Sequence, residues 1–114
     1  AAVDVGQAIN PDGIINQTEG GIIQAISWTL KEQVKFDRAR VTTRTWEDYP
    51  ILTFPEVPVV EVHLIDRPDE APLGAGEMAG GPVTAAIANA LHHALGVRVR
   101  DLPLTRERIA AALT

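Results

Sequence analysis

A glycine-rich turn that carries one carboxylate and leads into an apolar helical pattern is the feature that most constrains this chain. The turn is Gly74-Ala75-Gly76-Glu77, and Gly81-Pro82 follows four residues later. Glycine permits backbone conformations closed to other residues and lets a ligand approach the main chain closely. Proline suits the first turn of a helix, where its missing N–H is no loss. A single glutamate in this setting is placed well for proton transfer and poorly for packing.

The residues after this turn predict the clearest helix in the sequence. Its apolar stripe consists of Val83, Ala86, Ile87, Ala90, Leu91, Ala94 and Leu95. Gly96 is typical of a residue that ends a helix. Farther along, Thr105 predicts the N-cap of a final short helix that contains Ile109 and Leu113.

An earlier amphipathic helix is predicted from the spacing of Ile22, Ile23, Ile26 and Leu30. Asn16, three residues before Glu19, is typical of an N-cap with a capping box. A turn at residues 10–13, Asn-Pro-Asp-Gly, precedes it. Gly20-Gly21 would then lie in the first turn of the helix, at a cost of roughly 1 kcal/mol per glycine relative to alanine. That cost suggests that another part of the molecule approaches the backbone there.

Three stretches predict strands, namely residues 1–5, 40–46 and 60–64. Together with the helices they predict an α+β fold, with two or three strands and three helices, as a single domain over residues 1–114. The sequence starts as if a strand were entered midway. We therefore expect a fragment of a larger protein, some of whose apolar surface is covered by parts outside this chain.

Composition bounds the classes of partner. Fifteen acidic and ten basic residues give a formal charge of −5, which argues against nucleic acid or an anionic membrane as partner. No apolar run approaches the roughly 20 residues needed to span a bilayer. The chain has no cysteine, which excludes a disulfide framework and a thiolate metal site within it. Nothing in the composition favours the cytoplasm over the periplasm.

Two features stand out as candidates for chemistry. Glu77 is a candidate general base, and the alternative is an exposed loop carboxylate or an anion near the start of the following helix. Gln17 and Gln24 are seven residues apart, so they share a helix face and their amides can bind a polar ligand. The alternative for this pair is an ordinary polar helix surface.

The remaining polar and aromatic residues predict structural roles. His92 and His93 are adjacent, which is a poor spacing for two metal ligands on one helix, and His63 stands alone among strand residues. Trp46 and Tyr49 form either a wall for an aromatic ligand or the edge of a core. The basic cluster of Arg98, Arg100, Arg106 and Arg108 is interpreted as solvated surface.

Taken in order, several short stretches resemble the C-terminal end of the molybdenum-binding subunit of the xanthine dehydrogenase/aldehyde oxidase family. They are Val3-Asp4-Val5-Gly6 through Asn10-Pro11, Gln17-Thr18-Glu19-Gly20-Gly21 with Gln24, Asp48-Tyr49-Pro50, Gly74-Ala75-Gly76-Glu77, Ala86-Ile87-Ala88-Asn89-Ala90 and Leu102-Pro103-Leu104-Thr105. The stretch Trp46-Glu47-Asp48-Tyr49-Pro50 is similar to the branch of isoquinoline 1-oxidoreductase and nicotinate dehydrogenase β subunits. Each stretch is short, but the ordered set covers nearly the whole chain.

The resemblance implies a role for each matched position. Glu77 falls on the family's catalytic glutamate, which takes the proton of a hydroxide bound to molybdenum. Gln17 falls on a glutamine that hydrogen-bonds the molybdopterin cofactor, and the backbone of Ala75 and Gly76 would lie close to the ligands of the metal. No residue of this chain is expected to bind the metal directly. The implied substrate is a small N-heteroaromatic compound or an aldehyde, hydroxylated with oxygen from water.

The resemblance also implies partners. Iron–sulfur clusters on a partner subunit would receive the electrons. Most cofactor contacts and pocket walls would come from the upstream part of the same subunit, so this chain alone is expected to be inactive. Two other functions stay open from the residues themselves: a non-catalytic scaffold that self-associates through its apolar faces, and a small module that binds anions at the helix starts near Asn16 and Gly81.

Overall fold

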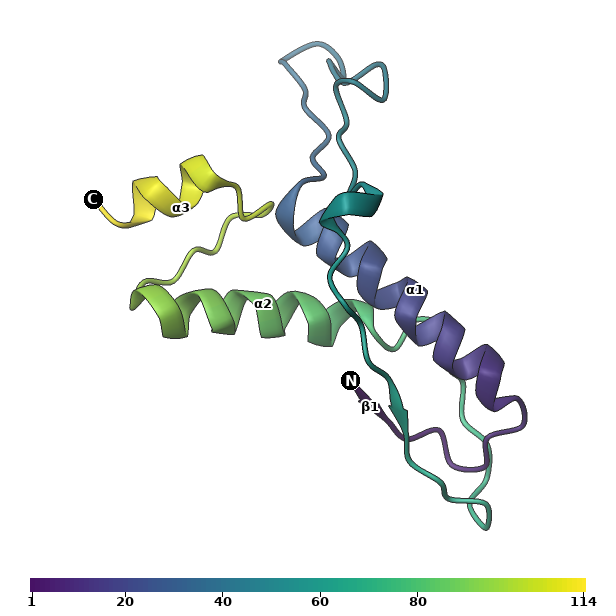
Figure 1. Ribbon diagram of the computed structural model, residues 1–114. Helices are drawn as coiled ribbons and strands as arrows, with labels where there is room; N and C mark the ends of the chain where they lie inside the picture. Colours follow the sequence, from purple (N-terminus) through teal and green to yellow (C-terminus); the bar gives the residue numbers. More distant parts are fainter.

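The computed structural model, which describes residues 1–114, contains three α-helices and two short strands (Figure 1). In chain order the elements are β1 (Ala2–Val3), α1 (Pro11–Leu30), a 3₁₀ turn (Phe54–Glu56), β2 (His63–Leu64), α2 (Gly80–Leu95) and α3 (Arg106–Ala112). This order confirms the α+β class, with three helices and two strands. None of the helices is both long and apolar enough to cross a bilayer.

Helix α1 begins six residues earlier than the sequence predicts. Its N-cap is Asn10, whose side-chain Oδ1 accepts a hydrogen bond from the Gly13 N–H at 3.0 Å. Pro11 occupies the first helical position, where it loses no hydrogen bond. The stretch Asn-Pro-Asp-Gly is therefore a cap and first turn rather than a separate turn. Asn16 is inside the helix, where its Nδ2 donates to the Asp12 carbonyl at 2.8 Å, so the predicted capping box with Glu19 is wrong.

Helices α2 and α3 end and begin where the sequence predicts. Gly96 ends α2 with a φ of 74°, a left-handed conformation that glycine adopts without strain. The Thr105 side chain accepts from the Arg108 N–H at 3.4 Å and caps α3. Helix α3 is only seven residues long, and it packs against none of the other helices or strands.

The two strands form a minimal parallel sheet. Ala2 lies opposite His63, and Val3 lies opposite Leu64. The strand predicted over residues 40–46 is absent. In its place Val41 makes a single antiparallel bridge with Phe36, across a turn closed by the Asp37 N–H, which donates to the Arg40 carbonyl at 2.9 Å. A run rich in valine and threonine has no sheet or core to pack on here, and β propensity depends on such packing.

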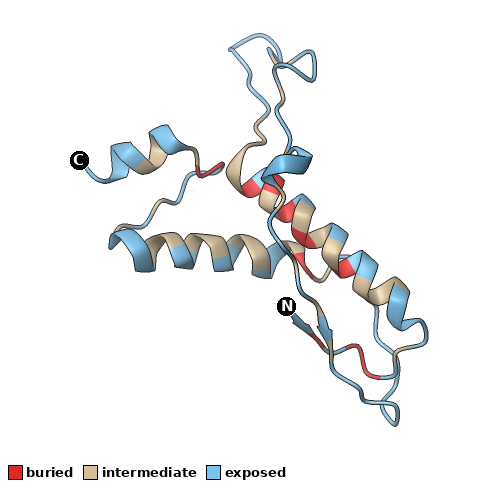
Figure 2. Ribbon diagram, viewed as in Figure 1, coloured by how far each residue is buried: buried red, intermediate tan, exposed pale blue.

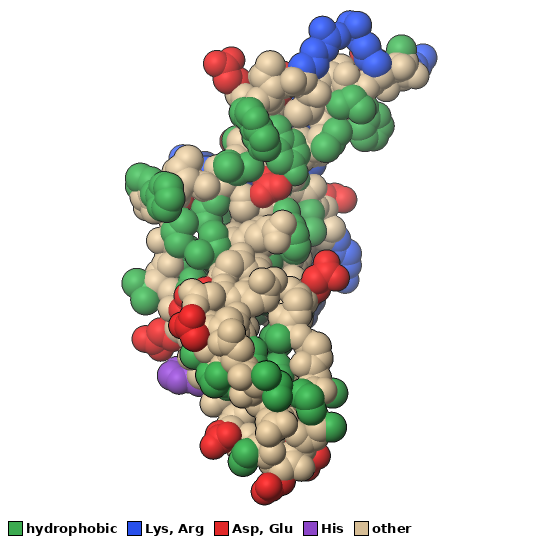
Figure 3. All heavy atoms as spheres, turned by 90° about the vertical axis from the view of Figure 1, so that its right-hand side faces the viewer, with side chains coloured by type: hydrophobic (Ala, Val, Ile, Leu, Met, Phe, Trp, Pro, Cys, Tyr) green, Lys and Arg blue, Asp and Glu red, His purple; other side chains and the backbone are tan.

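The core lies where α1 crosses the start of α2. Its buried apolar residues are Val3, Val5, Ile22, Ala25, Ala79 and Leu104. In Figure 2 the buried positions gather along one side of α1 and the segments next to it, while the loop that connects α1 to the 3₁₀ turn has no buried residue and is mostly exposed. This loop projects away from the helices as an arm (Figure 1). Figure 3 shows hydrophobic side chains open to solvent along the whole length of the molecule.

Candidate functional site

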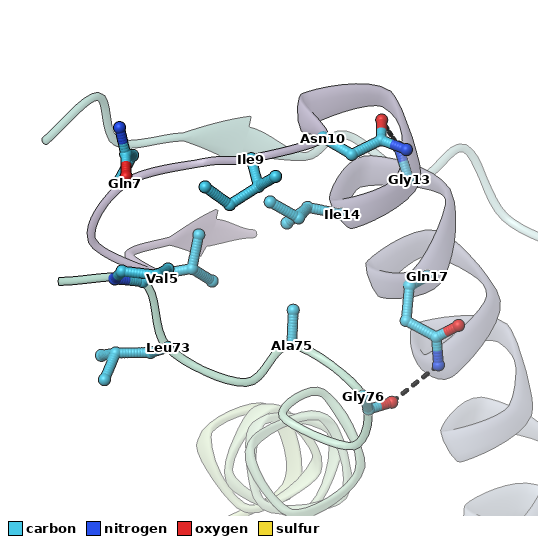
Figure 4. Close-up of a pocket in the computed structure, with 11 residues that line it drawn as sticks. Val5, Gln7, Ile9, Asn10, Gly13, Ile14, Gln17, Leu73, Ala75 and Gly76 are labelled. Atoms are coloured by element: carbon cyan, nitrogen blue, oxygen red, sulfur yellow. Dashed lines mark hydrogen bonds between the residues drawn. The ribbon is translucent and has the colours of Figure 1, made fainter. Parts of the chain in front are cut away.

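The first turns of α1, residues 5–9 before it and the glycine-rich turn line an open pocket of about 370 Å³ (Figure 4). Its lining residues are Val5, Gln7, Ile9, Asn10, Gly13, Ile14, Gln17, Pro72, Leu73, Ala75 and Gly76. The pocket therefore draws on two segments that are distant in the sequence, residues 5–17 and residues 72–76. Three of the four residues predicted for the site, Gln17, Ala75 and Gly76, lie together in it.

A hydrogen bond joins the two sides of this pocket. The Gln17 Nε2 donates to the Gly76 carbonyl at 2.6 Å, across 59 positions of sequence. In Figure 4 the Gln17 side chain reaches from α1 to the turn, and the Ala75 methyl points into the pocket. The bond leaves the Gln17 Oε1 as an acceptor that no protein group uses. Gln24, on the same helix, does not line the pocket.

Glu77 follows Gly76 directly in the chain but does not line the pocket. Its side chain is exposed, in the bend between the turn and α2. An added Cβ at Gly74 or at Gly76 would meet no other atom within 4 Å. The space beside the backbone at Gly74 and Gly76 is therefore open.

The far wall of the pocket is fixed by a tight contact around Gly6. This residue has a φ of 65°, and a Cβ there would lie 2.2 Å from the Ala71 carbonyl oxygen, so only glycine fits. The Gly6 N–H donates to Asp4 at 3.0 Å, and Arg67 donates to the same carboxylate at 3.0 Å. These two donors hold the pKa of Asp4 below its ordinary value. These contacts hold the backbone between Val5 and Gln7, two residues that line the pocket.

Two amide side chains in the pocket, Gln7 and Asn10, were not predicted from the sequence. Asn10 could have been found, because Asn followed by Pro is a common start for a helix, and helix starts gather ligands. The Oδ1 of Asn10 is used in capping, which leaves its Nδ2 as a donor. Gln7 carries no signal in the sequence alone. With Gln17 these residues bring three amide-bearing residues to the lining of one pocket, where the Gln7 amide is turned outward at the rim (Figure 4).

Other candidate residues lie outside this pocket. Trp46 and Tyr49 meet edge to face on the arm, with ring centroids 6.4 Å apart, and the Tyr49 hydroxyl donates to Glu32. No group of three or more His, Asp or Glu side chains is arranged to hold a metal ion. The alternative of an anion site at a helix start near Asn16 does not fit the structure, because α1 begins at Pro11.

Comparison with known proteins identifies the group to which this arrangement belongs. Residues 1–58 match the family model of the molybdopterin cofactor-binding domain. The chain is 49% identical over 110 residues to a nicotinate dehydrogenase subunit of Pseudomonas putida, covering 96% of this chain and 9% of that protein. It is 37% identical over 103 residues to the β subunit of isoquinoline 1-oxidoreductase of Brevundimonas diminuta, covering 90% of this chain and 13% of that protein.

A solved structure agrees with these relatives. The crystal structure of quinoline 2-oxidoreductase from Pseudomonas putida 86 superposes with a TM-score of 0.79 at 33% identity, covering 98% of this chain and 15% of that one. The chain thus spans only a small part of the length of the proteins that it matches. It belongs to the molybdopterin cofactor-binding domain family and corresponds to part of the molybdopterin-binding subunit of xanthine dehydrogenase-type oxidoreductases.

Proposed function

We propose that this chain forms one wall of the cofactor and substrate site of a molybdenum hydroxylase, with Glu77 as general base. The observation that carries the proposal is the Gln17–Gly76 hydrogen bond. It joins the residue predicted to contact the cofactor to the peptide unit immediately before the predicted base. The two predicted functions would therefore meet in one place, although the residues are far apart in the sequence.

The residues around the pocket fit a molybdopterin group. A pterin ring presents both donors and acceptors along its edges, and primary amides can pair with both kinds of atom. Asn10 and Gln17 supply two such amides from the α1 side of the pocket. The bare backbone at Gly74 and Gly76 leaves space in which a bulky group can approach the main chain. Gln17 would hold the pterin through its Oε1 while its Nε2 stays on the turn.

The bound cofactor would supply the redox chemistry of the reaction, as cofactors generally do. The chain's own contribution is to orient groups and to move a proton. Glu77 would accept a proton from the oxygen nucleophile that originates in water, while that oxygen attacks the substrate. A positioned general base contributes about 10²–10⁴ in rate. The substrate that we propose is a small N-heteroaromatic compound or an aldehyde.

The proposal requires other parts of the enzyme. Glu77 is exposed in this chain, and a base acts best where water is excluded, so the upstream part of the same subunit would close over this face. The exposed apolar side chains support such a cover, among them Ile9 beside the pocket, which is 73% exposed, and Leu73, which is 66% exposed. An iron–sulfur subunit would then receive the electrons.

The test is turnover of the full-length, partner-containing enzyme that carries Glu77→Gln. We expect kcat per bound molybdenum to fall by about 10² or more against a panel of N-heteroaromatics and aldehydes, with molybdenum content retained. Glu47→Gln is the matched control, because Glu47 is also an exposed loop glutamate but lies on the arm. Near-normal turnover of Glu77→Gln would contradict the proposal.

A further inference from the structure

Helix α1 contacts the segment from the glycine-rich turn into α2 at successive points along its length. Gln17 holds the Gly76 carbonyl, as described above. One turn of α1 later, a Cβ built on Gly21 would lie 3.2 Å from the Ala79 Cβ. Farther along, the Trp28 indole N–H donates to Thr84 at 3.1 Å. The segment that contains Glu77 is therefore laid along α1.

The contact at Gly21 is specific to that glycine. A Cβ on Gly20, the preceding residue, would meet nothing within 4 Å. Ala79 is 9% exposed, so its methyl is packed against the bare backbone of α1. A separation of 3.2 Å is tighter than nearly all real contacts of Cβ atoms, so a methyl on Gly21 would push Ala79 away by a few tenths of an ångström.

We infer that Gly21 is a positioning residue for Glu77, acting through the methyl of Ala79. Ala79 lies two residues after Glu77, at the start of α2. On the α2 side, Ala79 is held in place because the Thr84 hydroxyl is hydrogen-bonded to the side chains of both Trp28 and Thr29 on α1. The Thr84–Thr29 distance is 2.9 Å. On the other side the Gly76 carbonyl is held by Gln17, so a push on Ala79 is taken up between these two anchors, where Glu77 is exposed. This inference rests on the proposed role of Glu77 as the base.

The experiment uses the full-length holoenzyme with four variants. Gly21→Ala and Gly20→Ala place the same methyl on neighbouring positions of α1, and both raise helix propensity. Only the first meets Ala79. The double variant Gly21→Ala with Ala79→Gly moves the methyl from one side of the contact to the other. Glu77→Gln reports on the base itself.

We expect Gly21→Ala to lower kcat per bound molybdenum at least about tenfold with KM nearly unchanged, because small misplacements of a reacting group are costly. Gly20→Ala should stay within about twofold of the unsubstituted enzyme, and the double variant should recover most of the loss. Hydrogen exchange gives a readout independent of turnover: the amides of residues 76–80 should exchange faster in Gly21→Ala alone.

Three results would overturn the inference: equal kcat in the two single variants, no recovery in the double variant, or unchanged exchange over residues 76–80. Failure of the proposed function looks different. In that case Glu77→Gln turns over normally, whereas the exchange difference between Gly21→Ala and Gly20→Ala still shows whether Ala79 is held by α1.

Discussion

Glu56 is the carboxyl group whose pKa is shifted most clearly by its neighbours. Lys31 donates to it from the end of α1, at 2.6 Å from Oε2, and the Thr53 hydroxyl and N–H donate to the same oxygen at 2.7 and 2.9 Å. These donors, with Lys31 first, lower the pKa of Glu56 from 4.5 to about 2. The group thus ties the base of the arm to α1.

The sign of the resulting pH dependence follows from the lowered pKa. The unfolded chain binds the proton more tightly than the folded chain, so this contact stabilises the fold fully above about pH 4.5 and is lost as the pH falls toward 2. Because the two side chains are 28% and 40% exposed, solvent screens the pair and its contribution is small.

Removing the lysine should show the cause directly. We expect Lys31→Met to raise the pKa of Glu56 from about 2 toward 4.5 without reaching it, because Thr53 still donates. Carboxyl NMR titration measures this. Lys35→Met is the control, since no hydrogen bond or ion pair of its ammonium group is formed. An unchanged pKa of Glu56 in Lys31→Met would show that the pair does not form in solution.

Among the secondary-structure elements, α1 offers a direct comparison of two asparagines. Asn10→Ala removes the side chain that caps the Gly13 N–H and should destabilise the chain by about 1 kcal/mol. Asn16→Ala should be neutral or slightly stabilising, because alanine is the better helix former inside a helix. Chemical denaturation of the two variants distinguishes them. A larger loss of unfolding free energy in Asn16→Ala than in Asn10→Ala would mean that α1 begins at Asn16, as the sequence predicts.

The error at the start of α1 has a physical cause. Asn-Pro-Asp-Gly satisfies the preferences of a β-turn and equally those of a cap followed by a first helical turn, and only the following residues decide between them. By contrast, α2 was predicted well because its apolar stripe and Gly96 agree. Where several local patterns predict the same element, the prediction is reliable. Where a pattern fits two elements, packing decides which of them forms.

In the candidate site, too, local sequence patterns do not predict the contacts that depend on packing. The spacing of Gln17 and Gly76 predicts no contact, since the bond between them depends on how α1 packs on the turn. The family resemblance placed both residues in one site, and the structure brings them within hydrogen-bond distance. The close approach expected at the paired glycines is found, but only for Gly21, and in the middle of α1 rather than in its first turn.

For the molecule as a whole, the main feature is how little of the chain is buried. Only 11 of 114 residues are buried, and the accessible surface is 8203 Å², against about 6,100 Å² for a compact protein of this mass. The radius of gyration is 17.2 Å, where about 13 Å is expected. The excess surface includes Phe36 at 78%, Trp46 at 78% and Phe54 at 97% exposure, all on the arm or at its base. We expect these apolar side chains to be covered by other protein surfaces.

This surface predicts that the isolated chain associates with itself. Large apolar side chains that are exposed together mark interaction surfaces or aggregation sites. We expect light scattering coupled to size exclusion to give a mass above 12.3 kDa that rises with concentration. Replacing Phe36, Trp46 and Phe54 together by serine should shift the chain toward the monomer, because these three side chains contribute little to the core. As the matched control, replacing the exposed polar residues Arg38, Glu47 and Asp69 together by serine should leave the measured mass unchanged. A strictly monomeric chain at all concentrations would mean that the apolar faces are covered only by the rest of the subunit.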